Sequence, residues 1–383
     1  MEVGELGGDT GGPARLSQHV RDRLQTFHPA YFALPMATGV VSVAGHLLGL
    51  AEASELLYWI SLVAYGVLWA ITITRACRFS KSFLADWTSH QRGPGFFTTV
   101  SATCVVGTEI ALRQGPATAQ VFWWIGLGSW AVCTYTVFVA LAVRESKPTL
   151  ADGIHGGWLL AVVATQSVCV LGCRVLPATS GDRDLVLLLL ASLWLCGGML
   201  YVWMIALIFY RYMFFRFEPT DLMPPYWINM GAVAISTLAG TALVEAGVGS
   251  PVLGPLLPFL KGLTLMFWAT ATWWIPMLVI LGVWRHRVRG LRFAYDPLYW
   301  GLVFPLGMYS VCTFRLSGML GAPALQWIAK GFVIVALAAW LLTFFGMTTR
   351  LLFILLLALR GLSRSARPVA VPGTRPQTLR GSR

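Results

Sequence analysis

Charged residues are scarce in this chain of 383 residues, because only 11% are Asp, Glu, Lys or Arg, whereas 57% are hydrophobic. A soluble protein carries roughly 25% charged residues. Several apolar runs also reach the ~20 residues that an α-helix needs to cross a bilayer. The sequence therefore predicts an all-α integral membrane protein and argues against an ordinary soluble one.

Sequence motifs for catalysis, nucleotide binding and metal binding are missing as well. The chain contains no HExxH, no GxSxG, no Walker A loop and no close pair of carboxylates within an apolar run. None of its seven cysteines forms a CxxC pair, so we expect all seven to be small core residues rather than metal ligands. The sequence therefore predicts neither an enzyme nor a protein with a metal site or a cofactor.

Ten apolar segments are long enough to be considered as membrane spans. The third and the fifth are the shortest, and the last is too long for one simple span. Their approximate limits are 29–50, 56–75, 96–112, 119–143, 156–174, 184–210, 224–247, 254–284, 297–320 and 325–357.

Positive charge is in excess, since 28 Lys and Arg against 16 Asp and Glu give a net charge of +12. If the amino terminus lies inside, the outer loops hold only Arg113, Arg174 and Arg183. Because cytoplasmic loops are enriched in Lys and Arg, we predict a multi-pass protein of the cell membrane with both termini in the cytoplasm. The net charge then reflects contact with anionic lipid, so we expect the lipid bilayer as a partner and no nucleic acid.

The count of ten apolar segments divides the chain into three parts. Residues 1–27 form a polar cytoplasmic tail, residues 28–357 form a domain of ten transmembrane helices, and residues 358–383 form a disordered basic tail rich in Arg, Pro and Gly. The spans that start on the inside begin near residues 29, 96, 156, 224 and 297. This roughly even spacing predicts five helical hairpins arranged about one axis.

Charged residues inside the spans are candidates for function, because a charge at the bilayer centre costs roughly 2.5–3.5 kcal/mol on insertion scales. All of them lie toward the predicted outer ends. They are Glu109, Glu245, Lys261, Arg315 and Lys330. For the two lysines we expect side chains that reach the interface.

Arg315 stands out among them. It follows Phe304 by eleven residues, which places both side chains on one helix face, about 16 Å apart along the axis. Pro305 also frees the carbonyl of Gly301 from the helix ladder. These features suit the mouth of an aqueous path. An ion pair of Arg315 with Glu109 or Glu245 is the alternative.

Five segments together resemble a known family. They open or fill the spans that start on the inside, and they read FHPAYFALPMATGVVSVAG, GPGFFTTVSATCVVG, GGWLLAVVATQSVCVLG, PPYWINMGAVAISTLAG and YWGLVFPLGMYSVCTFRLS. In this order they are similar to the tellurite-resistance/C4-dicarboxylate transporter family. It includes bacterial tellurite-resistance proteins, fungal malate permeases and sulfite pumps, and the slow-type anion channels of plant guard cells. The similarity covers about residues 28–350.

The resemblance implies a homotrimer in which each subunit has its own central pore, lined by the five helices that start on the inside. It also implies that a Phe on the ninth helix plugs this pore. The Phe-Pro pair of the family matches Phe304 and Pro305 here, and we carry the role of pore gate over to Phe304.

The expected function is the transport of anions, either a C4-dicarboxylate such as malate or small inorganic anions, through a pore gated by Phe304. An aromatic ring at the narrowest point would block ions until it moves aside. The alternative is a proton-coupled carrier for dicarboxylates or sulfite, with Glu109, Glu245 and His46 as candidate proton-binding groups. A membrane scaffold without transport is a third possibility, which the lack of a sizeable soluble domain argues against.

Overall fold

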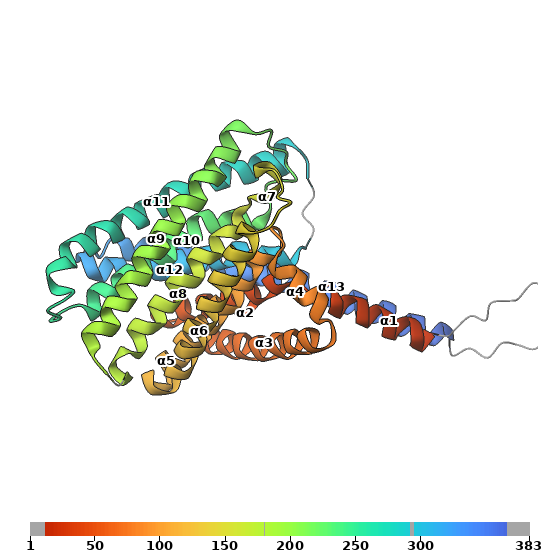
Figure 1. Cartoon of the computed structure of the whole chain (residues 1–383), viewed down its shortest axis with the longest axis horizontal. Helices are drawn as coiled ribbons and strands as arrows, with labels where there is room; N and C mark the ends of the chain where they lie inside the picture. Colours follow the sequence, from red (N-terminus) through yellow and green to blue (C-terminus); the bar gives the residue numbers. More distant parts are fainter. Residues whose placement is uncertain (1–11, 180, 292–294, 366–383) are drawn as a thin grey trace, which may run out of the picture.

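The structure, a computed structural model, describes residues 12–179, 181–291 and 295–365. All regular elements in these ranges are helical, with no strand. Ten long helices form five hairpins (Figure 1), and the predicted all-α architecture is therefore confirmed.

The first helix of each hairpin belongs to an inner set and the second to an outer set. The inner helices are α2 (Ala33–Leu47), α5 (Phe97–Gln114), α8 (Leu160–Val175), α10 (Ile228–Ala246) and α12 (Trp300–Leu320). The outer helices are α3 (Ala51–Arg78), α6 (Pro116–Ala142), α9 (Arg183–Phe214), α11 (Leu257–Val283) and α13 (Leu325–Ser365). Three further helices precede or connect hairpins, namely α1 (Gly12–Gln25), α4 (Ser80–Trp87) and α7 (Leu150–Gly153).

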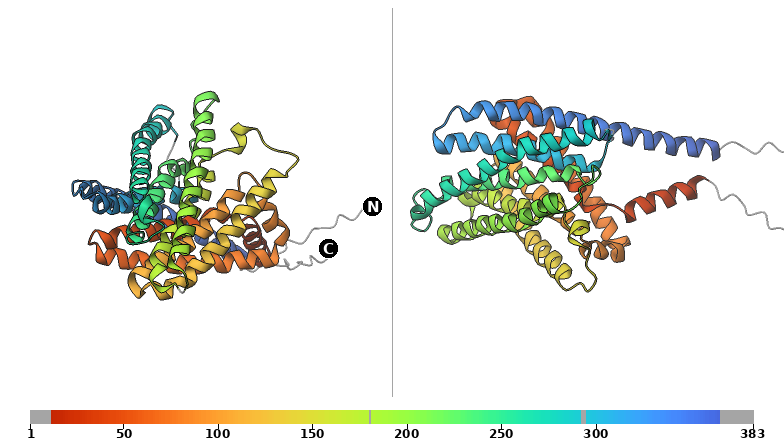
Figure 2. Two further views of the ribbon diagram at one scale, coloured as in Figure 1. Left: turned by 60° about the vertical axis from the view of Figure 1, so that its left-hand side comes forward. Right: turned by 90° about the horizontal axis from the view of Figure 1, so that it is seen from above.

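The inner helices form a closed ring. Each packs against the inner helices before and after it in the chain, and α12 packs against α2. The inner segments are far more buried than the outer ones: 94% of the apolar stretch of Pro224–Ala246 is buried, against 22% in Gly254–Val288. The outer helices thus expose apolar side chains around an inner ring, and two turned views show them on the outside of the bundle (Figure 2). The five hairpins predicted from the even spacing are confirmed.

The number of membrane spans is less simple. Nine helical segments of the described residues are long and apolar enough to cross a bilayer, and α12 is not among them. Its 21 residues correspond to about 31 Å of helix, close to the ~30 Å of a bilayer core. Arg315 and Pro305 lower its apolar character, and its neighbours α2, α10 and α13 cover most of it. Ten spans therefore stay a prediction.

A repeated hydrogen bond fastens the outer helices to the ring. In each case an aromatic side chain of one hairpin's outer helix bonds to the inner helix of the next hairpin, and α13 bonds back to α2. The pairs are Tyr65–Thr103 at 2.9 Å, Trp130–Thr165 at 2.8 Å, Trp194–Ser236 carbonyl at 2.8 Å, Trp268–Thr313 at 3.0 Å and Trp340–Thr38 at 2.9 Å. Each contributes about 1 kcal/mol, and together they fix the rotation of every inner helix.

A second closed ring lies where the inner helices begin. It consists of five short turns, which contact one another in chain order with the last contacting the first: η1 (Pro29–Phe32), η2 (Gly93–Phe96), η3 (Gly156–Leu159), η5 (Pro224–Trp227) and η8 (Pro297–Tyr299). We call this ring the girdle. It needs glycine at Gly156, because a Cβ there would lie 2.4 Å from the Pro225 carbonyl oxygen. The opposite end of the bundle is the far end.

Histidines cap two of the girdle turns. His28 Nδ1 accepts a hydrogen bond from the Ala30 amide at 3.0 Å, and His155 Nδ1 accepts one from the Gly157 amide at 3.1 Å. Burial lowers the pKa of both imidazoles to about 4, and the nearby Arg92 guanidinium adds to this effect at His28. Both rings are therefore neutral at neutral pH, as a cap that accepts a hydrogen bond requires.

Acid is expected to weaken the girdle. The pKa of His155 falls from 6.5 to about 4 on folding, so the unfolded state binds more protons below pH 6.5 and stability is lost as the pH falls from about 6.5 to about 4. At about pH 5 the loss from this residue is about 2 kcal/mol. We expect a lower unfolding temperature in detergent at about pH 5 than at about pH 7. His155→Asn keeps a cap acceptor without titrating and should lose less; an equal loss in the variant would contradict this assignment.

An ion-pair triad holds helix α1 against the girdle end. Asp86 pairs with Arg75 at 2.8 Å and with Arg92 at 2.7 Å. Arg75 also donates to the Gln25 carbonyl at 3.1 Å, and Arg92 donates to the Phe27 carbonyl at 2.8 Å. The two arginines thus bind the end of α1 to the region of α3 and α4.

Both ends of the described chain lie at the girdle end, where α1 contacts the last part of α13 (Figure 1). Helix α13 continues to Ser365, eight residues beyond the predicted end of the membrane domain, and the rest of the predicted tail, residues 366–383, lies outside the described residues. The expectation that all cysteines are core residues is wrong for Cys77 and Cys196, which are exposed on outer helices.

Candidate functional site

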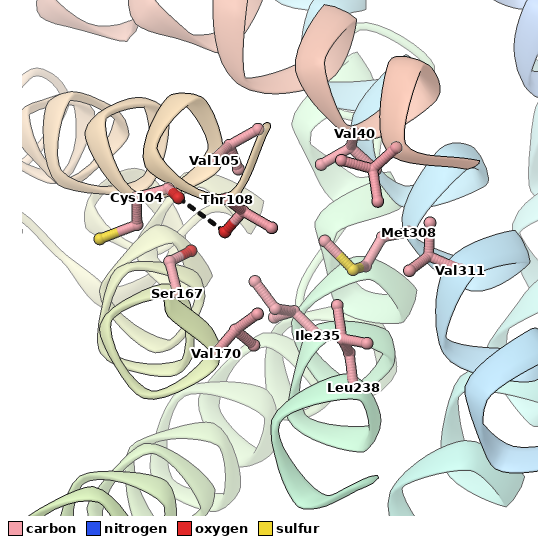
Figure 3. Close-up of a pocket in the computed structure, with 11 residues that line it drawn as sticks. Val40, Cys104, Val105, Thr108, Ser167, Val170, Ile235, Leu238, Met308 and Val311 are labelled. Carbon is pink, nitrogen blue, oxygen red and sulfur yellow. Dashed lines mark hydrogen bonds between the residues drawn. The ribbon is translucent and has the colours of Figure 1, made fainter. Parts of the chain in front are cut away.

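Two adjoining cavities lie inside the ring of inner helices. The first is lined by side chains from all five inner helices (Figure 3). The second is also lined by all five and reaches the far end. They share one residue from each helix, namely Val43, Thr108, Val170, Leu238 and Val311. We call the two together the central cavity and these shared residues its middle ring.

The lining follows helical spacing, so that one face of every inner helix looks onto the axis. Each middle-ring residue has a lining neighbour three or four residues before it and another on the following turn. Three examples are Val40, Val43 and Leu47 on α2, Ser167, Val170 and Arg174 on α8, and Met308, Val311 and Arg315 on α12. The two cavities therefore follow one another along the axis, and their wall is largely apolar.

The few hydroxyls in this wall are already bonded. Thr108 donates to the Cys104 carbonyl at 2.8 Å, and Ser167 donates to the Val163 carbonyl at 2.7 Å. Both bonds stay within one helix, as Ser and Thr in helices often do. A solute inside the wall would meet hydroxyl groups without finding a tight binding site.

Basic side chains gather at the far end of the central cavity. Arg174 and Arg315 both line it there, together with the exposed carboxylate of Glu245. Arg315 is half-buried, and its Nε has no hydrogen-bond partner in the described part of the chain. Two cations facing one carboxylate give the mouth a positive potential, which raises the local concentration of anions.

The sequence left two alternatives for Arg315, the mouth of an aqueous path and an ion pair with Glu109 or Glu245. Glu245 lies beside Arg315 in the wall, yet no ion pair within 4.0 Å joins them. Glu109 lies elsewhere, on the face of α5 that packs against Gly39 of α2. His46 is exposed at the end of α2 and lines neither cavity.

Phe304 lies at the girdle side of the central cavity. It shares one face of α12 with Met308, Val311 and Arg315, since spacings of four, seven and eleven residues fall within about 60° of rotation. The other three line the cavity, whereas Phe304 lies one turn below and its ring is 0% exposed. Phe304 thus lies outside the lining of the two cavities, on the girdle side of Met308.

Close contacts on both sides hold this turn of α12 in place. A Cβ on Gly231 of α10 would lie 2.7 Å from Cγ of Pro305, so the proline ring fits into the space that the glycine leaves. A Cβ on Gly307 would lie 3.1 Å from side chains of Val40 and Val41 on α2. Pro305 therefore lies at the α10 interface, beside Phe304 and not in the wall of the cavity.

The sequence analysis did not predict most of the residues that line the central cavity. Val43, Val170, Leu238 and Val311 are ordinary apolar residues, and nothing in their type separates an axial face from a packed one. One pattern could have identified these residues. Counting back three and four residues from Arg315 and Arg174, and using the same helical spacing on every inner helix, gives the face that lines the axis.

Comparison with known proteins points to one class of protein. A family model described as SLAC1, voltage-dependent anion channel, matches residues 26–348. An uncharacterized transporter of Methanocaldococcus jannaschii is 25% identical over 334 residues, covering 85% of this chain and 93% of the relative. A sulfite efflux pump of Arthroderma benhamiae is 23% identical over 343 residues, covering 84% and 90%. An uncharacterized membrane protein of Mycobacterium tuberculosis is 38% identical over 148 residues, covering 39% and 75%.

Proposed function

The chain belongs to the SLAC1 family of voltage-dependent anion channels, and from this premise we propose that it moves anions passively along the central cavity of each subunit. Anion transport itself follows from the family. What supports the route is that all five inner helices contribute to one axial space with two arginines at its mouth. In this proposal Arg174 and Arg315 attract the anion, and Phe304 is the gate.

The wall favours conduction over tight binding. Its middle ring consists of four aliphatic side chains and Thr108, and a hydrophobic constriction controls ion passage by excluding water. Selectivity for anions then comes from the positive mouth. Small inorganic anions and C4-dicarboxylates such as malate are the substrate classes of this proposal.

The assembly and orientation belong to the same proposal. We place the protein in the plasma membrane as a homotrimer with a separate conduit in each subunit. Both described ends lie at the girdle end, and the excess of Lys and Arg in the loops of that end favours a cytoplasmic girdle.

Flux into liposomes tests the function. Purified protein in liposomes should carry chloride, nitrate, malate or sulfite down its gradient, with currents that reverse at the Nernst potential of the permeant anion. Absence of flux for every anion, in protein that is folded, would contradict it.

A proton-coupled carrier is the second candidate. The names of relatives that are sulfite efflux pumps and the fully buried Glu109 favour it. Uphill accumulation of the anion driven by a pH gradient would support the carrier, and flux that runs only down the anion's own gradient would support the channel.

A further inference from the structure

A carboxyl group lies buried beside the ring, outside the central cavity. Glu109 on α5 is 0% exposed, and neither of its carboxyl oxygens has a hydrogen-bond partner in the described residues. It fits there because α2 carries Gly39, where a Cβ would lie 2.7 Å from Glu109 Oε2 and 3.1 Å from Ser61 Oγ. A carboxylate without water or donors is strongly disfavoured.

The hydroxyls beside this carboxyl have already donated their protons. Ser42 Oγ donates to the Ser54 carbonyl at 2.8 Å, and Ser61 Oγ donates to the Pro35 carbonyl at 3.2 Å. Each hydroxyl has one proton to donate and can then only accept. While these two bonds are made, the hydroxyls offer Glu109 only lone pairs, to which a carboxylic acid that carries its own proton can donate.

A polar path leads from Glu109 to the far end. Ser42 Oγ lies 3.4 Å from Ser54 Oγ, and Arg113 Nη2 donates to these two hydroxyl oxygens at 3.2 Å and 2.8 Å. Arg113 Nε in turn pairs at 3.1 Å with the exposed carboxylate of Glu55. We call Ser42, Ser54, Ser61, Glu109 and Arg113 the lateral cluster.

The charged groups around Glu109 leave its carboxyl unpaired. From α5, Arg113 turns its guanidinium to Glu55 and over the Tyr58 ring, 4.3 Å from the ring centroid. From α3, Glu55 and Tyr58 face the cluster near the far end. From α2 come Gly39 and Ser42, and His46 lies one turn further on, exposed.

We propose that Glu109 is a proton-binding site, separate from the anion path, that exchanges its proton with water at the far end and thereby sets the anion flux. The link to the cavity is Val105, which lines the wall and whose Cγ1 lies 2.6 Å from the position of a Cβ on Gly39. Removing the proton places an unpaired charge in the contact between α2 and α5, and so changes the packing of the wall. This inference rests on the proposed anion transport.

Glu109→Gln tests the proposal, because glutamine has the shape of the protonated acid and does not titrate. In liposomes carrying chloride, wild-type flux should differ between about pH 5 and about pH 9 at the far side. The Glu109→Gln variant should have the same flux at both pH values, and this flux should equal that of the wild-type protein at about pH 5. Glu52→Gln, at the exposed start of α3, is the matched control and should keep the wild-type pH dependence.

A second readout does not depend on transport. The infrared difference spectrum of the purified protein between acid and alkaline buffer should contain the carbonyl band of a protonated carboxylic acid, lost in Glu109→Gln. If no anion moves at any pH, the proposed function fails while this band still decides the proton site. A pH-dependent flux that persists in the variant, or an unchanged band, overturns the inference. Should the variant not fold, Ser61→Ala removes a hydroxyl beside the carboxyl and should shift the midpoint of the pH dependence of flux; an unmoved midpoint also overturns the inference.

Discussion

Replacing Phe304 with alanine is expected to raise anion flux by at least about tenfold, which corresponds to a barrier lower by about 1.4 kcal/mol. The ring is completely buried one turn below Met308, where the central cavity ends. In the proposed mechanism, the aromatic side chain at that point excludes water from the axis, and water must enter before an ion can pass. Flux of chloride and malate into liposomes measures the effect.

The variant needs a control for the loss of a buried ring, since Phe→Ala in a core costs about 3–5 kcal/mol wherever it occurs. Phe267 provides it. Its ring is 3% exposed and packs at 5.7 Å against Trp194, away from the axis. Phe267→Ala should destabilise the fold similarly and leave flux unchanged. A folded Phe304→Ala protein with wild-type flux would remove Phe304 as the gate.

Asp86→Asn is expected to produce a large loss of stability, about 3–5 kcal/mol, because breaking a buried ion pair leaves its partner charged and uncompensated. The Arg75 side chain is only 3% exposed, and Asp86 is the carboxylate that faces both it and Arg92. The unfolding temperature in detergent should fall accordingly, and α1 should become accessible to protease.

An exposed ion pair offers the comparison. Arg216 and Glu218 pair at 3.2 Å with side chains 89% and 53% exposed, and such pairs contribute at most about 1 kcal/mol. Glu218→Gln should therefore change the unfolding temperature little. If both variants behaved alike, the triad would not be what fastens α1 to the bundle.

Much of the architecture could be predicted from apolar runs alone. Their even spacing predicted the five hairpins, because each hairpin needs one inner and one outer span. The number of apolar runs did not predict that the inner helices are largely buried whereas the outer helices are largely exposed. Helix α12 is surrounded by other helices rather than lipid, and so it tolerates Arg315 and Pro305. These two residues lower the mean hydropathy of α12.

The contacts between hairpins could not be predicted, because they depend on how each helix is rotated. Trp340 and Thr38 are 302 residues apart in the chain and 2.9 Å apart in the fold. The same rotation separates the two candidate acids. Glu245 lies at the mouth beside Arg315, whereas Glu109 points toward α2 and α3. From residue type and predicted depth in the membrane alone, Glu109 and Glu245 were equivalent candidates.

Access of a charged thiol reagent to the middle ring tests most directly whether anions pass through the central cavity. Val311→Cys places a thiol on the axis, in the wall of both cavities. Val279→Cys on α11 places one on the outer surface, where the valine is 49% exposed. Labelling from the far end should reduce anion flux at least about tenfold in Val311→Cys and leave it unchanged in Val279→Cys. Full labelling of Val311→Cys with unchanged flux would contradict the account.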